Sequence, residues 1–151
     1  MKKIIAALVF LSVTASAFAQ QALKPDDAVK YRKAAMAFQS WNMSKIKANV
    51  DGTFNKDQVV AAANAIAAVA NSGIGELFAP GTDMAALGDK THLKPEYFQQ
   101  PDKAKEVATN YLREANELAK VAASGDAAAV KAQFGKTGST CKGCHDAFQA
   151  K

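Results

Sequence analysis

The chain has 151 residues, of which 49% are hydrophobic and 22% charged, and its formal net charge at pH 7 is +5. This length indicates one domain and is sufficient to bury a hydrophobic core. The lysines are scattered rather than clustered, so the composition argues against a nucleic-acid partner.

Residues 1–19 have the features of a secretory signal peptide. Two early lysines precede an apolar run, residues 4–13, that is too short for a comfortable membrane span. Residues 17–19 form a small-x-small cleavage site, so cleavage is the preferred interpretation and an uncleaved anchor is the alternative. We therefore expect an exported domain of residues 20–151, with no membrane segment. Its formal charge falls from +5 to +3, because the signal carries two lysines and no acid.

The first helix is predicted to span residues 24–50. Pro25 suits the first helical position, and the two aspartates that follow it favour the positive end of the helix dipole. Asp51 and Gly52 end the helix. Its apolar seam repeats every seven residues and contains Val29, Met36, Met43 and Val50, with Ile46 in the companion register.

Two polar residues, Arg32 and Gln39, share the face of this helix that should point to the core. Arg32 alone would be a rim residue whose guanidinium reaches water. Beside an anionic cofactor, an arginine is instead suited to pair with a carboxylate. Both interpretations of Arg32 stay open on the pattern alone, and we take Arg32 and Gln39 as candidate cofactor-binding residues.

Two more helices and their turns are marked by capping residues. The second helix begins after Asn55, a suitable N-cap with Gln58 in the capping-box position, and ends before residues 71–73. The third helix begins near Pro101 and ends at residues 124–125. The turn that follows is very short, which predicts that the third and fourth helices are antiparallel neighbours.

Residues 73–101 form one long connection, in which glycines and prolines interrupt every periodic pattern. Phe78 and Phe98 are expected to pin this connection to the bundle. Residues 96–98 are expected to form a single helical turn after a proline.

The fourth helix is capped by Asp126 and runs to the end of the chain. Val130, Phe134 and Phe148 share one stripe of it. Two glycines near its middle lower the helix propensity, but we still expect one continuous helix.

Residues 141–145 of the fourth helix read C-x-x-C-H, the attachment signature of a c-type haem. The thiols of Cys141 and Cys144 can form thioethers with the porphyrin, and His145 can be the axial iron ligand. On a helix, Cys141 and His145 lie ~40° apart and Cys144 ~60° to the other side, so all three face one way. We predict one covalent haem c. The predicted export agrees with this haem, because c-type haem is attached on the far side of the bacterial inner membrane. We therefore expect a periplasmic protein.

Three other interpretations of the motif are weaker. A redox dithiol of the thioredoxin kind should follow a strand, and no such pattern is found. A structural zinc site needs about four ligands, and His92 is far away in a loop-like stretch, where we expect an exposed residue rather than a second iron ligand. A disulfide at this spacing within a helix is sterically awkward.

Four amphipathic helices, one long middle loop and this motif on the last helix resemble the class II c-type cytochromes, and within them the cytochrome c′ family. The resemblance covers nearly all of residues 20–151. It is carried by four stretches: 27–32, 79–82, 124–126 and 141–146. It implies an all-α, antiparallel up-down-up-down four-helix bundle, for which cytochrome c′ is itself a standard example.

The resemblance also implies roles for individual residues. His145 becomes the proximal ligand, Met36 an apolar side chain over the distal face, and Arg32 the arginine near the haem propionates. Members of the family are periplasmic, commonly dimerise through their first helices, and bind nitric oxide and carbon monoxide. One position departs from the family: Gln149 stands where a basic residue is common, so it offers a hydrogen bond without a positive charge.

Three functions remain after this comparison. The preferred one is a gas-binding protein with five-coordinate iron behind an apolar lid, with possible transfer of electrons to a redox partner protein. The alternative is a low-spin electron carrier in which Met36 or Met43 is the sixth ligand. A structural bundle without haem leaves the motif unexplained. We do not expect an enzyme, because no acid–base pair or nucleophile accompanies the motif.

Overall fold

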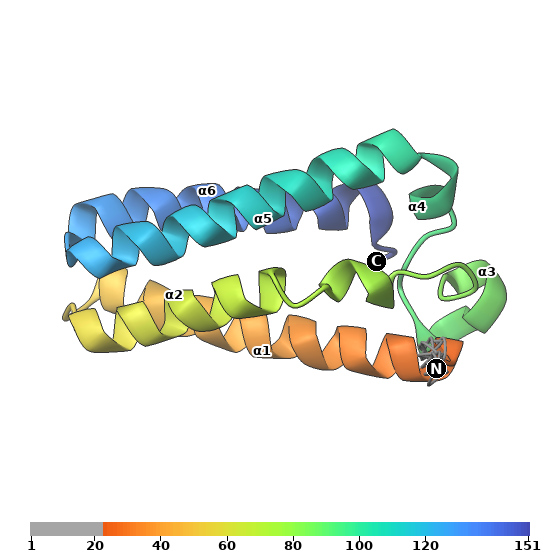
Figure 1. Cartoon of the computed structure of the whole chain (residues 1–151), viewed down its shortest axis with the longest axis horizontal. Coiled ribbons are helices and arrows are strands. Elements are labelled where there is room, and N and C mark those ends of the chain that lie inside the picture. The colour runs from red at the N-terminus through yellow and green to blue at the C-terminus, as the bar shows by residue number, and fades with distance from the viewer. Residues whose placement is uncertain (1–22) are drawn as a thin grey trace, which may run out of the picture.

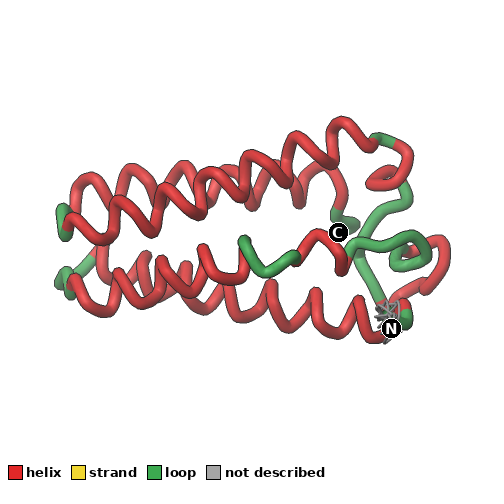
Figure 2. Tube along the Cα trace, in the orientation of Figure 1, coloured by secondary structure: helices red, strands yellow, loops and turns green. Residues whose placement is uncertain are grey.

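The computed structural model describes residues 23–151, and its long elements are all α-helices (Figures 1 and 2). The predicted signal peptide lies outside these residues. The four long helices are α1 (Pro25–Asp51), α2 (Lys56–Ala70), α5 (Pro101–Ser124) and α6 (Ala127–Phe148). The predicted all-α four-helix bundle is confirmed. None of the described helices is long and apolar enough to cross a membrane.

Consecutive long helices run in opposite directions along one common axis (Figure 1). α2 packs against both α1 and α5, and α5 packs against α6, whereas α1 and α6 contact each other less extensively. The connection between α2 and α5, the start of α1 and the C-terminus all lie at the same end of the bundle (Figure 1). We call this end the open end and the opposite one the packed end.

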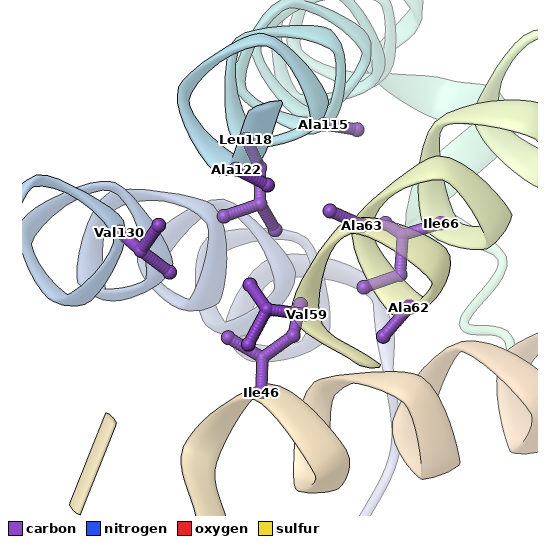
Figure 3. Packing of buried hydrophobic residues seen from close by; sticks show 9 residues of the cluster. All are labelled: Ile46, Val59, Ala62, Ala63, Ile66, Ala115, Leu118, Ala122 and Val130. Atoms are coloured by element: carbon purple, nitrogen blue, oxygen red, sulfur yellow. The ribbon is translucent and has the colours of Figure 1, made fainter. Parts of the chain in front are cut away.

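The packed end contains the main hydrophobic core. Its side chains point toward one another from all four long helices, as Figure 3 shows. Alanines make up much of this cluster, and their small side chains allow the helices to approach closely. The buried members are Ile46, Val59, Ala62, Ala63, Ile66, Ala115, Leu118, Ala122 and Val130.

Side-chain caps close the two turns of the packed end. Asn55 Oδ1 accepts a hydrogen bond from the Gln58 amide at 3.0 Å, and Asp126 Oδ1 accepts one from the Ala128 amide at 2.9 Å, so both predicted caps are confirmed. The capping-box role of Gln58 is wrong. Its side-chain oxygen accepts from Asn49 Nδ2, while Asn49 Oδ1 accepts from the Asn55 amide at 2.7 Å. An asparagine of α1 therefore replaces the reciprocal bond and ties α1 to the start of α2.

The connection contains short helical pieces: η1 (Ile74–Leu77), α3 (Met84–Leu87), η2 (Gly88–Lys90) and α4 (Glu96–Gln99). The helical turn predicted after Pro95 is confirmed as α4. His92 is exposed, as predicted.

A second, smaller core holds the connection against α5 and α6. Its buried members are Leu93, Ala104, Val107 and Phe148. Phe78 and Phe98 pack on it, which confirms their predicted anchoring role. The Lys94 amide also donates to the Phe148 carbonyl at 2.8 Å, so the connection is bonded directly to the end of α6.

Candidate functional site

The two motif cysteines lie in the last turns of α6, which continues unbroken through Gly135 and Gly138 as predicted. Both are free thiols and half-buried, while His145 is exposed. Burial raises the pKa of both thiols, and a negative charge on Cys141 would raise that of Cys144 further.

These pKa directions separate the candidate chemistries of the motif. Redox-active dithiols have a lowered pKa and commonly sit at a helix N-terminus, where the dipole stabilises a thiolate. Here the cysteines are near the C-terminal end of α6 and their pKa is raised. Within residues 23–151, no group of three or more His, Cys, Asp or Glu side chains is arranged to hold a metal ion. The donor set therefore fits covalent attachment of a porphyrin better than a redox dithiol or a zinc site.

The glycines around the motif show where space is available. A Cβ atom added at Gly135 or Gly143 would meet nothing within 4 Å, whereas one at Gly138 would lie 3.9 Å from Met43 Cε. Gly143 lies two residues from both Cys141 and His145, so it is on the opposite, exposed face of α6. Gly138 is instead the point where α1 packs on α6.

The Met43–Gly138 contact fixes the level at which α1 faces the motif. α1 and α6 run in opposite directions (Figure 1), so seven residues back along α1 correspond to seven residues forward along α6. Each step covers about 10.5 Å at 1.5 Å per residue. Met36 therefore lies at the level of His145, on the helix that faces the motif.

Gln39 is in contact with Met36 on its own helix and with Tyr111 of α5. Gln39 is only 8% exposed, and its Nε2 lies 3.8 Å from Met36 Sδ. The hydroxyl of Tyr111, from α5, donates a hydrogen bond to Gln39 Oε1. Tyr111 also lies close enough to Cys141 for a charge there to affect its pKa. These contacts bring the candidate residues of α1 and α6 into one region.

Arg32 is buried, at 6% exposed, so its interpretation as a rim residue is wrong. Its Nη1 donates to the Leu77 carbonyl and to Thr82 Oγ1, both at 3.1 Å. Its Nη2 donates to the Thr82 carbonyl at 2.9 Å and to Thr91 Oγ1 at 2.7 Å. Arg32 thus binds two distant parts of the connection to α1. Burial lowers its pKa.

The side chain of Tyr97 links Arg32 to the motif. Its ring stacks on Phe78 at 5.2 Å between centroids and meets Phe148 edge-on at 5.3 Å, while the Arg32 guanidinium lies 4.8 Å from the Phe78 centroid. Burial raises the pKa of Tyr97, a charge on Cys144 raises it further, and Arg32 lowers it. An aromatic cluster therefore connects α1 to α6 at the open end.

Sequence reasoning missed Tyr97, Tyr111 and the two threonines that accept from Arg32. Threonines and tyrosines of this kind carry no motif, and the bonds of Thr82, Thr91 and Tyr111 to α1 span 50 or more residues. Only a buried arginine in an apolar seam signals that acceptors must exist somewhere in the fold.

The face of α1 opposite the seam exposes three aromatic side chains. Tyr31, Phe38 and Trp41 are 49%, 45% and 57% exposed, respectively. With Ala34 they follow the three-and-four spacing of a coiled-coil stripe. We call these four residues the outer stripe. The spacing was visible in the sequence, but only the fold shows that it points away from the bundle.

The chain was compared with known proteins. The family model described as "Cytochrome C'" matches residues 27–149. A cytochrome c′ of Rhodocyclus tenuis is 54% identical over 129 residues, covering 85% of this chain and 97% of the relative.

Two solved structures are similar as well. One is a cytochrome c′ described as having an unusual ligand-controlled dimer dissociation, with 48% identity and a TM-score of 0.80, covering 85% of this chain and 98% of the other. The second is the nitric oxide complex of a cytochrome c′ variant from Alcaligenes xylosoxidans. It has 26% identity and a TM-score of 0.75, and the match again covers 85% of this chain and 98% of the other.

Proposed function

The chain belongs to the cytochrome c′ family, and we propose that it is a periplasmic protein that binds nitric oxide and carbon monoxide. The cofactor of this family is haem c, as predicted from the motif.

Cys141 and Cys144 would hold the haem through thioethers, and His145 would bind the iron. When bound, the haem would supply an iron that can coordinate a diatomic gas. The half-buried thiols with raised pKa, near the C-terminal end of α6, support this assignment.

The observation that carries the proposal is the position of Met36 at the level of His145, within the apolar seam of α1. A half-buried thioether in this place is a flexible apolar plug. It admits small neutral diatomics when it moves aside. It disfavours charged ligands, because these need polar partners, and larger ligands, because they do not fit. Met36 would therefore act as a lid over a five-coordinate iron.

The same position supports one alternative. A methionine sulfur is a soft donor, and Met36 lies where a sixth ligand would have to come from. A Met/His pair suits electron transfer by raising the redox potential. Contact of Sδ with the Gln39 amide favours the lid, because that sulfur already has a partner within α1.

Arg32 would pair with a haem propionate. Its four hydrogen bonds all go to neutral oxygens, and it belongs to no ion pair among residues 23–151. A buried guanidinium without an opposite charge is costly, and a cofactor carboxylate near the open end would relieve that cost.

The outer stripe of α1 would form a homodimer interface. Exposed aromatics at this spacing are typical of helix pairing, and one similar structure is described by its dimer dissociation. Lys45 Nζ lies 3.7 Å from the Trp41 centroid and would form part of the polar rim. Trp41→Glu should convert a dimer to monomers in analytical ultracentrifugation, whereas a change at exposed Lys120 should not.

Titration of the reduced protein with carbon monoxide tests the proposed function. We expect one molecule of gas per haem, detected as a shift of the Soret band. Met36→Ala should bind the gas faster than the wild type, because the lid is shortened. A reduced wild-type protein that takes up no gas would contradict the proposal. Since we expect a binding protein rather than an enzyme, the bound gas should not be consumed.

A further inference from the structure

Gln39 and Tyr111 form a polar contact inside an apolar part of the bundle. Gln39 is 8% exposed, and Tyr111 is half-buried against the main core. A buried amide destabilises the fold unless its donor and acceptor are both engaged. Here both are: Oε1 accepts from the Tyr111 hydroxyl, and Nε2 lies 3.8 Å from Met36 Sδ.

The chemistry of the partners fixes the direction of this chain of contacts. A thioether sulfur can only accept a hydrogen bond, so the amide nitrogen of Gln39 faces Met36 and its oxygen is left for Tyr111. Tyr111 must then be the donor. Burial raises the pKa of Tyr111, so its hydroxyl keeps the proton at neutral pH. A charge on Cys141 contributes less than burial, and thioether formation would remove it.

We propose that Gln39 and Tyr111 are positioning residues that hold Met36 in place over the face opposite His145. The inference rests on the proposed function and adds the device that controls the lid. Tyr111 belongs to α5 and Met36 to α1, so the contact ties the lid to a second helix. Gas entry then requires the Gln39–Met36 contact to break, and its strength sets the rate at which the lid opens.

We call the contacts from Tyr111 through Gln39 to Met36 the relay, and removal of the Tyr111 hydroxyl tests it. Tyr111→Phe keeps the ring in the core and deletes only the donor to Gln39, while Gln39→Leu deletes the contact with Met36 directly. We expect each to raise the association rate of carbon monoxide about three- to tenfold, which corresponds to one lost hydrogen bond. Asn116→Ala is the matched control, because it removes another bond of α5, to Asn71 at 2.8 Å, far from Met36 along the chain.

The same variants in the Met36→Leu background separate positioning from a general structural effect. Leucine offers no sulfur, so the relay has no acceptor there, and Tyr111→Phe should change the rate less than about twofold. A purely structural role of Tyr111 would give the same change in both backgrounds.

A second readout does not depend on gas binding. Peptide mass spectrometry after chloramine-T treatment of the holoprotein measures sulfoxide formation at each methionine. Oxidation of Met36 relative to Met43 should rise in Tyr111→Phe and in Gln39→Leu, because the Met36 sulfur loses its partner. Met43 lies one heptad away on the same seam and serves as the internal standard.

The outcomes are distinguishable. If the wild type takes up carbon monoxide, two results would overturn the relay and leave the proposed function intact. One is an equal effect of Tyr111→Phe in the wild type and in Met36→Leu, and the other is an unchanged Met36/Met43 oxidation ratio. A wild type that takes up no gas overturns both. Faster uptake that disappears in the Met36→Leu background, together with faster Met36 oxidation, supports the relay.

Discussion

The two ends of the bundle are stabilised by different interactions. At the packed end, buried alanines and aliphatic residues from four helices fit together, and side-chain caps close both turns. At the open end, the α1–α6 pair is joined through a buried arginine, threonines of the connection and an aromatic cluster around Tyr97. Apolar helix packing and local caps hold the packed end, whereas the open end is held by polar and aromatic contacts between distant parts of the chain.

The largest expected effect is at the open end. Cys141→Ala combined with Cys144→Ala removes both thioether positions, so covalent haem should be lost completely. Haem staining of a denaturing gel detects this directly. Covalent haem in the double variant would show that the motif is not the attachment site.

A large effect is also expected at the packed end, but without a change at the cofactor. Leu118→Ala deletes a fully buried side chain of the main core and should lower the free energy of unfolding by about 2–5 kcal/mol. Chemical denaturation measures the loss. The haem spectrum should stay as in the wild type, and a changed spectrum would mean that the two ends are not independent.

Substitution of Arg32 should have an intermediate effect, which is seen both in the stability of the fold and in the order of the connection. Arg32→Met keeps the length of the side chain but removes the hydrogen bonds that Arg32 donates to Thr82 and Thr91, at a cost of about 1–3 kcal/mol. Hydrogen exchange should accelerate in residues 77–93 and not in α2. Equal acceleration in both segments would contradict a specific role of Arg32 in holding the connection.

The smallest effect concerns the pH dependence of the α5–α6 contact. Hydrogen bonds donated by Gln133, which has the larger effect, and by Arg113 lower the pKa of Glu114. A carboxyl with a lowered pKa in the folded state stabilises it above its ordinary pKa, and this contribution is lost as the pH falls through the lowered value. Glu114→Gln should therefore reduce the loss of stability between neutral and acidic pH. An unchanged acid profile in this variant would rule out a contribution from Glu114.

The elements and the cofactor could be predicted from the sequence because their signals are local. Prolines, aspartates and glycines mark the ends of α1, α5 and α6, heptad spacing gives the seam, and C-x-x-C-H is specific for haem. The family and the fold class predicted in this way are confirmed. The predicted signal peptide and the homodimer stay predictions.

The contacts that position the site could not be predicted, because they join residues far apart in the chain. Arg32 meets Thr91 and Gln39 meets Tyr111 only after the bundle and its connection have formed. The capping-box prediction at Gln58 failed for a different reason: Asn49, close by in the chain at the end of α1, binds both the Gln58 side chain and the Asn55 amide. The outer stripe shows a related case: its spacing is local, but whether it faces the core or the solvent is decided by the whole fold.

The optical spectrum of the ferric holoprotein, compared with that of Met36→Leu, tests the central claim that Met36 is a lid opposite His145. A lid leaves the iron five-coordinate, so both proteins should give high-spin spectra and differ mainly in the rate of gas binding. A low-spin wild type that becomes high-spin in Met36→Leu would contradict this account and identify Met36 as the sixth ligand of an electron carrier.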